Sequence, residues 1–183
     1  DVDIAVEADG VAFGQALARA LGGRAAPHEK FGTAVVLWPG GRVDVATTRT
    51  EFYDEPAGLP NVEAATIRQD LYRRDFTVNA MAVSLRGEDF GRLADFFGGL
   101  DDLEKGVVRV LHNLSFIDDP TRIFRAIRYE NRYRFRMDGH TTALARACID
   151  MGLVGELSSA RLRDELELLL DEVHRYEGTV NQF

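Results

Sequence analysis

The chain begins with Asp1-Val2-Asp3-Ile4-Ala5-Val6, in which polar and apolar residues alternate. This alternation has the period of a β-strand, so residues 1–7 are predicted to form one. Residues i and i+2 of a strand share a face, so the carboxylates of Asp1 and Asp3 should point the same way, about 7 Å apart at the backbone. Such a pair can converge on one or two Mg²⁺ ions. Asp-x-Asp on an exposed strand edge is also common, and alone the motif favours that interpretation.

Outward from this strand, the spacing of apolar residues and turn residues predicts an α+β unit followed by helices. In the α+β unit we predict helices at 11–21 and 65–72, a hairpin of strands 31–38 and 42–47, an irregular loop at 50–62 and a strand at 107–111. Further helices are predicted from 118 to about 133, at 141–151 and at 159–173, the last capped by Ser158 or Ser159. The predicted division is therefore 1–112 and 113–183.

Asp44 lies between Val43 and Val45 on the second predicted hairpin strand. If that strand pairs beside the first, its carboxylate joins those of Asp1 and Asp3. Three carboxylates placed in this way can hold two metal ions, which activate an attacking hydroxyl and stabilise a leaving phosphate. Taken by itself, Asp44 is more simply interpreted as a surface acid.

The string Arg73-Arg74-Asp75-Phe76-Thr77-Val78-Asn79 follows a predicted helix. It could form a local salt-bridge network at the helix end. It could also recognise phosphate or ribose, because guanidinium is a permanent bidentate donor, while Asp75 and Asn79 can bond a ribose hydroxyl. The spacing alone leaves both interpretations open.

Asp118-Asp119-Pro120 begins a predicted helix whose arginines lie on one broad face, namely Arg122, Arg125, Arg128 and Arg132. Asp119 and Arg122 are one turn apart, and such a pair can read a base edge, since carboxylate accepts from an exocyclic amine and guanidinium donates to ring acceptors. A solvated helix face paired with acids such as Glu130 would have the same pattern.

The composition limits the class of protein. The net charge of −8 over 183 residues argues against binding nucleic acid with the whole surface, while the arginine cluster of residues 122–136 suggests a site for one phosphate-bearing ligand. The single cysteine, Cys148, excludes an intramolecular disulfide and suits a reducing cytosol. The chain lacks an apolar run of about 20 residues, so we predict no membrane span and a cytoplasmic location.

Together these strings resemble class II tRNA nucleotidyltransferases, the CCA-adding enzymes and their poly(A) polymerase and A-adding relatives, over residues 1–170 and in the family's order. Asp1-Val2-Asp3 resembles the metal-binding Asp-x-Asp, 73–79 the Arg-Arg-Asp motif, 95–103 the Gly-rich hinge, and 118–122 the base-reading Glu-Asp-x-x-Arg. The resemblance implies a polymerase-beta-like head of small mixed sheet and helices, followed by an all-helical neck.

The resemblance also implies roles for the candidate residues. Asp1 and Asp3 would be ligands of two Mg²⁺ ions, and Asp44 would be the third catalytic carboxylate. The nucleotide-binding residues would be Arg74, Asp75, Asn79, Asp119, Arg122, Arg125 and Arg128. Among these, Arg74 would contact phosphates, and Asp119 and Arg122 would select the base. Residues 50–62 match the family's mobile loop, which helps to position the nucleotide.

The implied reaction adds C or A, from CTP or ATP, to the 3′ end of tRNA. Alternatives are a poly(A) polymerase or an A-adding enzyme of the same family, and a catalytically silent nucleotide- or RNA-binding module. Two departures stand out. The family's Gly-Gly-x-Val-Arg-Asp segment, which precedes Asp-x-Asp, does not occur in this sequence, so we expect a missing N-terminal part. Asp118 stands where the base-reading motif has glutamate.

Overall fold

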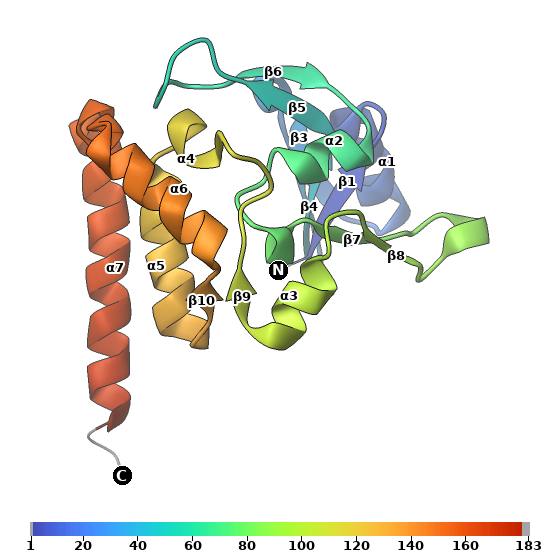
Figure 1. Cartoon of the computed structure of the whole chain (residues 1–183). Coiled ribbons are helices and arrows are strands. Elements are labelled where there is room, and N and C mark those ends of the chain that lie inside the picture. The colour runs from blue at the N-terminus through green and yellow to red at the C-terminus, as the bar shows by residue number, and fades with distance from the viewer. Residues whose placement is uncertain (1, 181–183) are drawn as a thin grey trace. The chain divides into compact units, whose positions relative to one another are not determined.

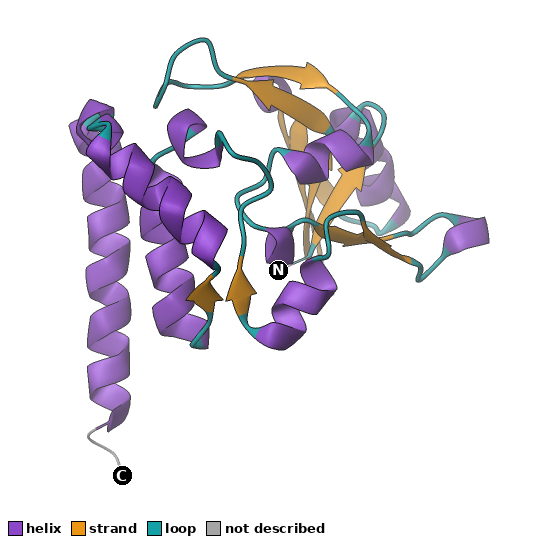
Figure 2. Ribbon diagram, in the orientation of Figure 1, coloured by secondary structure: helices purple, strands orange, loops and turns teal. Residues whose placement is uncertain are grey.

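The computed structural model describes residues 2–180, with side chains described as far as residue 172. Contacts divide the chain into two compact units, one comprising Asp1–Phe52 and Asn61–Arg73, the other Tyr53–Pro60 and Arg74–Phe183. Figures 1 and 2 show small sheets and helices in the same chain, which confirms the α+β class. The sequence predicts a boundary at residue 112 between an α+β part and an all-helical part. The two compact units are defined by contacts, so this boundary stays a prediction.

A four-stranded sheet forms the centre of the first unit. Its strands are β1 (Asp3–Val6), β2 (Arg24–His28), β3 (Thr33–Trp38) and β4 (Gly41–Thr47), in the order β1-β4-β3-β2. β1 runs parallel to β4, whereas the other neighbours are antiparallel. Helix α1 (Gly10–Ala20) packs on the sheet, and its Ala18 shares a buried core with Val36, Val43 and Val45. The predicted hairpin is confirmed, with Trp38 opposite Gly41.

Helix α1 begins and ends where its sequence indicates. The Asp9 side chain accepts a hydrogen bond from the backbone of Ala12 at 2.9 Å, and Gly22, with φ of 64°, follows the last turn. A Cβ on Gly10 would lie 2.6 Å from the backbone nitrogen of Thr47, so only glycine lets the helix start this close to β4. β2 was not predicted, because its exposed edge-strand sequence contains Pro27 and does not alternate.

The predicted irregular loop at 50–62 is wrong at both ends. β5 (Arg49–Phe52) and β6 (Asn61–Ala64) pair antiparallel, so only 53–60 is irregular. The residues of these strands are exposed or half-buried. Their sequence therefore lacks the alternation of apolar and polar residues from which a strand is predicted. The helix predicted at 65–72 is confirmed as α2 (Ile67–Tyr72), which starts with a capping box between Thr66 and Gln69.

The second unit combines a hairpin with a helical bundle. Its elements are β7 (Met81–Val83), β8 (Leu93–Asp95), α3 (Gly99–Lys105), β9 (Val107–Val108), α4 (Ser115–Asp118), α5 (Thr121–Tyr133), β10 (Arg136–Met137), α6 (Gly139–Asp150) and α7 (Ser159–Val180). Short 3₁₀ turns occupy Glu29–Phe31, in the first unit, and Thr77–Asn79, Gly87–Asp89 and Leu153–Glu156, in the second. The core of the second unit centres on Phe76, Val108, Phe116 and Ile123.

The predicted helices after residue 118 are confirmed, although the short strand β10 lies between α5 and α6 and pairs in parallel with β9. Ser158 caps α7 through its side-chain oxygen, which accepts from the backbone of Arg161 at 3.4 Å. The helix α5 places Ile123 and Ala126 in the core. None of the described helices is long and apolar enough to cross a membrane.

Candidate functional site

Asp3 and Asp44 are directly opposite each other on the parallel strands β1 and β4. Neighbouring strands lie about 4.8 Å apart, and residues in register project from the same face. Because Val43 and Val45 are buried in the core, Asp44 and its neighbour Asp3 lie on the other face of the sheet. Two carboxylates at this spacing suit the oxygen-ligand preference of a hard divalent cation.

Arg42 neutralises Asp44 in this structure. Its guanidinium donates to both carboxylate oxygens, at 3.1 Å to Oδ1 and 2.9 Å to Oδ2. Asp1, the other predicted ligand, lies outside the described residues. Within the part of the chain that the structure describes, no cluster of three acidic, histidine or cysteine side chains could hold a metal. Val2 is 63% exposed and precedes the strand, which begins at Asp3.

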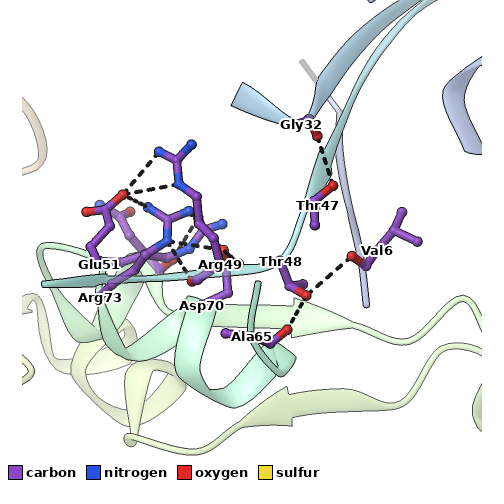
Figure 3. A network of polar contacts seen from close by, with 11 residues as sticks. Val6, Gly32, Thr47, Thr48, Arg49, Glu51, Ala65, Asp70 and Arg73 are labelled. Atoms are coloured by element: carbon purple, nitrogen blue, oxygen red, sulfur yellow. Dashed lines mark hydrogen bonds and ion pairs between the residues drawn. The ribbon is translucent and has the colours of Figure 1, made fainter. Parts of the chain in front are cut away.

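A buried ionic network in the first unit connects β5 to α2 (Figure 3). Asp70, 2% exposed, accepts from the Arg49 backbone at 3.1 Å and from Arg73 Nη2 at 2.9 Å. Arg73 also bonds Glu51 at 2.9 Å, and Glu51 accepts from Arg49 at 3.1 Å. The interpretation of Arg73 as part of a salt-bridge network at the helix end therefore holds.

Asp75 and Asn79 organise the start of the second unit. Oδ1 of Asp75 accepts from the Phe76 backbone and from Asn79 Nδ2, both at 2.9 Å, while Oδ2 lies 2.7 Å from Arg125 Nη2. Asn79 Nδ2 also lies 2.7 Å from the Tyr129 hydroxyl. Burial alone would lower the pKa of Arg125, but the Asp75 carboxylate raises it. These contacts occupy groups that the sequence suggested for ribose recognition, and their nucleotide-binding role stays a prediction.

Arg74 lies beside the same turn. Its Nη1 donates to the Asn79 carbonyl at 3.5 Å. The predicted contact of Arg74 with phosphates is compatible with this geometry and stays a prediction.

The turn between α4 and α5 carries the predicted base-reading residues. Oδ1 of Asp119 accepts from the backbone of Thr121 at 3.0 Å, from its hydroxyl at 2.6 Å and from Arg161 Nη2 at 2.7 Å. Arg122 is 6% exposed, and its Nη1 donates to the Ser115 hydroxyl at 2.8 Å. Asp119 and Arg122 are thus both held in defined orientations within one turn of the chain.

Asp118, predicted to correspond to the glutamate of the base-reading motif, lies next to His112, with Oδ2 3.9 Å from Nδ1. Burial raises the pKa of Asp118, although His112 and Arg122 oppose the shift. Burial and the charge of Arg122 lower the pKa of His112. Asp118 therefore lies in a partly buried environment next to His112, whose lowered pKa favours the neutral imidazole.

Acidic residues of α7 cover part of the predicted arginine face of α5. Arg128 Nε lies 3.1 Å from Glu172, and Arg128 Nη1 lies 3.4 Å from Glu165. The Arg128 side chain is only 17% exposed, so the predicted solvent-facing row of arginines is interrupted at this residue. Arg161, Glu165 and Glu172 were not predicted as site residues, since their contacts lie more than 35 positions away along the chain. The acidic composition of the last helix was the only available signal.

Residues 1–109 match the family model described as the poly A polymerase head domain. The A-adding tRNA nucleotidyltransferase of Geobacter sulfurreducens is 50% identical over 173 residues, which cover 94% of this chain and 20% of that protein. An apo structure of a CCA-adding enzyme matches with a TM-score of 0.90 at 48% identity, over 97% of this chain and 44% of that one.

A tRNA nucleotidyltransferase complexed with a primer tRNA and an incoming ATP analog gives a TM-score of 0.80 at 37% identity, over 96% of this chain and 51% of that chain. The chain therefore spans about half, or less, of the length of each of these relatives.

Proposed function

The chain belongs to the poly A polymerase head domain family, and on that premise we propose that it carries the catalytic head and part of the neck of a tRNA nucleotidyltransferase. The substrates are ATP or CTP and the 3′ end of tRNA, and the site of action is the cytoplasm. The observation that carries the proposal is the alignment of Asp3 with Asp44 on one sheet face, in a chain that also holds Asp119 and Arg122 in one turn.

The proposed reaction is an in-line displacement without a covalent enzyme intermediate. The tRNA 3′-oxygen forms a bond to the α-phosphorus, the bond from that phosphorus to the β-phosphate oxygen breaks, pyrophosphate leaves, and the hydroxyl proton passes to solvent. Bound Mg²⁺, with Asp1, Asp3 and Asp44 as ligands, would supply charge that favours the ionised hydroxyl and the leaving group.

The chain's own residues bind and orient the nucleotide. Arg74 contacts the phosphates, and Asp119 and Arg122 present an acceptor and a donor to the Watson–Crick edge of the base. Asp75, Asn79, Arg125 and Arg128 complete the nucleotide site chiefly by fixing the surrounding elements, as their ion pairs and hydrogen bonds support.

The test is nucleotide incorporation by the full-length protein. tRNAs ending at the discriminator base, in C or in CC are each incubated with one NTP at a time. Incorporation of A onto the CC-ending tRNA alone would match the A-adding relative. Asp3→Ala should reduce incorporation by at least about 100-fold, since several kcal/mol of transition-state stabilisation would be lost. Unchanged incorporation by Asp3→Ala would contradict the proposal.

Poly(A) polymerase activity is the second candidate, favoured by the description of the matched family. The same assay with tRNA ending in CCA separates the two. No addition to this already complete 3′ end supports the tRNA nucleotidyltransferase, whereas a long A tail on that tRNA supports the poly(A) polymerase.

A further inference from the structure

Two residues of α5 contact two residues of the turn that opens the second unit. Arg125 and Tyr129 are four positions apart, so they lie on neighbouring turns of one helix face. Arg125 pairs with Asp75 at 2.7 Å, and the Tyr129 hydroxyl lies 2.7 Å from Asn79 Nδ2. Asp75 and Asn79 are also four positions apart, so the helix and the turn are joined at two points.

The Tyr129 ring is fixed by packing against other rings. It meets the fully buried Phe76 edge-on, with the ring centroids 5.5 Å apart. It also contacts the Tyr133 ring, at 5.4 Å between centroids. Because an aromatic side chain has few rotamers and these neighbours restrict them further, the Tyr129 hydroxyl keeps a defined position beside the turn.

The Asn79 amide is oriented by two acceptors. Its Nδ2 donates to Asp75 Oδ1 at 2.9 Å and to the Tyr129 hydroxyl at 2.7 Å. The Asp75 carboxylate is paired with Arg125 and can only accept, so the nitrogen of the amide, and not its oxygen, must face it. An amide nitrogen carries two hydrogens, and both are used here.

The two residues suggested for ribose recognition therefore differ in what they can still offer a ligand. Both oxygens of Asp75 already accept, Oδ1 from Asn79 and from the Phe76 backbone, and Oδ2 from Arg125. The Asn79 carbonyl oxygen, Oδ1, accepts from no group among the described residues. The hydrogen bonds to Nδ2 thus set aside one acceptor on a half-buried side chain.

Building on the proposed function, we propose that Tyr129 is a positioning residue for sugar recognition. Its hydroxyl holds the Asn79 amide in the orientation that leaves Oδ1 to accept from a ribose hydroxyl of the incoming nucleotide. Without this hydroxyl, the amide keeps one of its two fixed bonds. The terminal torsion of asparagine is broad, so Oδ1 would no longer have a single direction. Tyr129 acts through Asn79 and does not touch the sugar.

Tyr129→Phe tests this role by removing one oxygen while keeping the ring packed on Phe76. Full-length protein without tRNA is titrated with ATP and CTP and with their 2′-deoxy and 3′-deoxy forms. For the nucleotide that binds more tightly, the ratio of ribonucleotide affinity to deoxynucleotide affinity should fall by about 3- to 10-fold, as expected for one neutral hydrogen bond. The deoxy form whose ratio falls identifies the hydroxyl that is recognised.

Tyr133→Phe is the matched control. Tyr133 lies about one turn further along α5, its side chain is 50% exposed, and its ring contacts that of Tyr129. This variant should leave both affinity ratios unchanged. Unfolding midpoints show which variants retain the fold, and only folded variants are compared.

A double-mutant cycle separates positioning from direct contact. Asn79→Ala should itself lower the affinity ratio, and Tyr129→Phe should add nothing in that background, because the amide that Tyr129 orients is gone. An additive loss would mean that Tyr129 acts on the nucleotide directly, and it would overturn the positioning role.

Unchanged affinity ratios in Tyr129→Phe would also overturn the proposal, as would equal binding of ribonucleotide and both deoxy forms by the wild-type protein. Incorporation onto tRNA, measured in parallel, tests the proposed function separately. A wild-type protein that binds ATP or CTP and incorporates neither would refute the reaction, and the affinity ratios would still decide the role of Tyr129.

Discussion

Asp3 and Asp44 face each other across the only parallel strand pair in the described sheet of the first unit. An antiparallel hairpin, β3 and β4, brings Asp44 next to the strand at the start of the chain. Like charges so close repel unless a cation lies between or beside them, and here Arg42 supplies that cation for Asp44 at 2.9 Å.

The first prediction concerns this arginine. If Asp44 is a metal ligand, Arg42 competes with the metal for its carboxylate. Arg42→Gln should therefore lower the Mg²⁺ concentration that gives half-maximal incorporation, by several-fold, or roughly 1 kcal/mol, because the pair is partly exposed and screened by solvent. A magnesium titration of wild-type and variant full-length protein measures it. A higher magnesium requirement in the variant would contradict competition.

Arg128 carries the second prediction. Glu165 and Glu172 are 14% and 12% exposed, and Oε2 of Glu172 is buried without a hydrogen-bond partner among the described residues. Arg128→Met would leave two buried carboxylates without their cation, so the free energy of unfolding should fall by about 3–5 kcal/mol. Chemical denaturation measures it.

The same position offers its own control. Combining Arg128→Met with Glu165→Gln and Glu172→Gln removes the uncompensated charges, and most of the lost stability should return. If the triple variant were as unstable as Arg128→Met, buried charge would not be the reason. A raised KM for nucleotide in the triple variant would show that Arg128 also binds the nucleotide.

The sequence predicted those parts of the fold that local patterns determine. The helices predicted at 11–21 and from 118, and the Ser158 cap of α7, each depend on residues only a few positions apart in the chain. β5 and β6 were not predicted, because these strands are defined by their pairing with each other and not by burial of one face. β2 escaped because an edge strand tolerates Pro27 and exposed side chains.

In the candidate site, too, features set by neighbouring residues could be predicted, whereas contacts between distant residues could not. The acids and arginines could be found by spacing, because each motif is a short string. Their partners could not, since the contacts from Asp75 to Arg125 and from Asp119 to Arg161 join residues 50 and 42 positions apart. Helix periodicity placed Arg128 on a face with other arginines, but only the packing of α7 on α5 shows that glutamates cover it.

Asp95, which precedes the glycine pair Gly98-Gly99, provides a pH-dependent prediction. Burial would raise the pKa of Asp95, but backbone N–H groups of residues 97–100 hold it below the usual range of aspartate. Its oxygens accept from Gly99 at 2.8 Å and from Leu100 at 2.9 Å. Since the pKa is lower in the folded state, the ionised group stabilises the fold above the ordinary aspartate pKa of about 3.9.

Asp95→Asn should therefore cost roughly 1–2 kcal/mol of unfolding free energy at pH 7, because its amide cannot accept both sets of hydrogen bonds. As the pH falls through the folded-state pKa, wild-type Asp95 becomes protonated and loses this advantage. Urea denaturation of both proteins at neutral and strongly acidic pH measures the difference. A difference that stays constant across this range would contradict ionisation as its source.

Two ion pairs with identical spacing allow the effect of burial to be isolated. Asp70 pairs with Arg73 and Asp89 pairs with Arg92, both three positions apart, but the acid side chains are 4% and 49% exposed. Asp70 also accepts from the Arg49 backbone, so it holds β5 against α2. Asp70→Asn should lower the free energy of unfolding by about 2–4 kcal/mol, because buried donors lose their charged acceptor.

Asp89→Asn is the matched control, and it should change the free energy of unfolding by less than about 0.5 kcal/mol, since exposed pairs gain little over hydration. Hydrogen exchange adds a local measurement: Asp70→Asn should speed exchange at the Arg49 amide, whose acceptor is weakened, while Asp89→Asn should leave it unchanged. Equal losses of stability in the two variants would mean that sequence spacing, rather than burial and the bond to Arg49, sets the strength of the Asp70 pair.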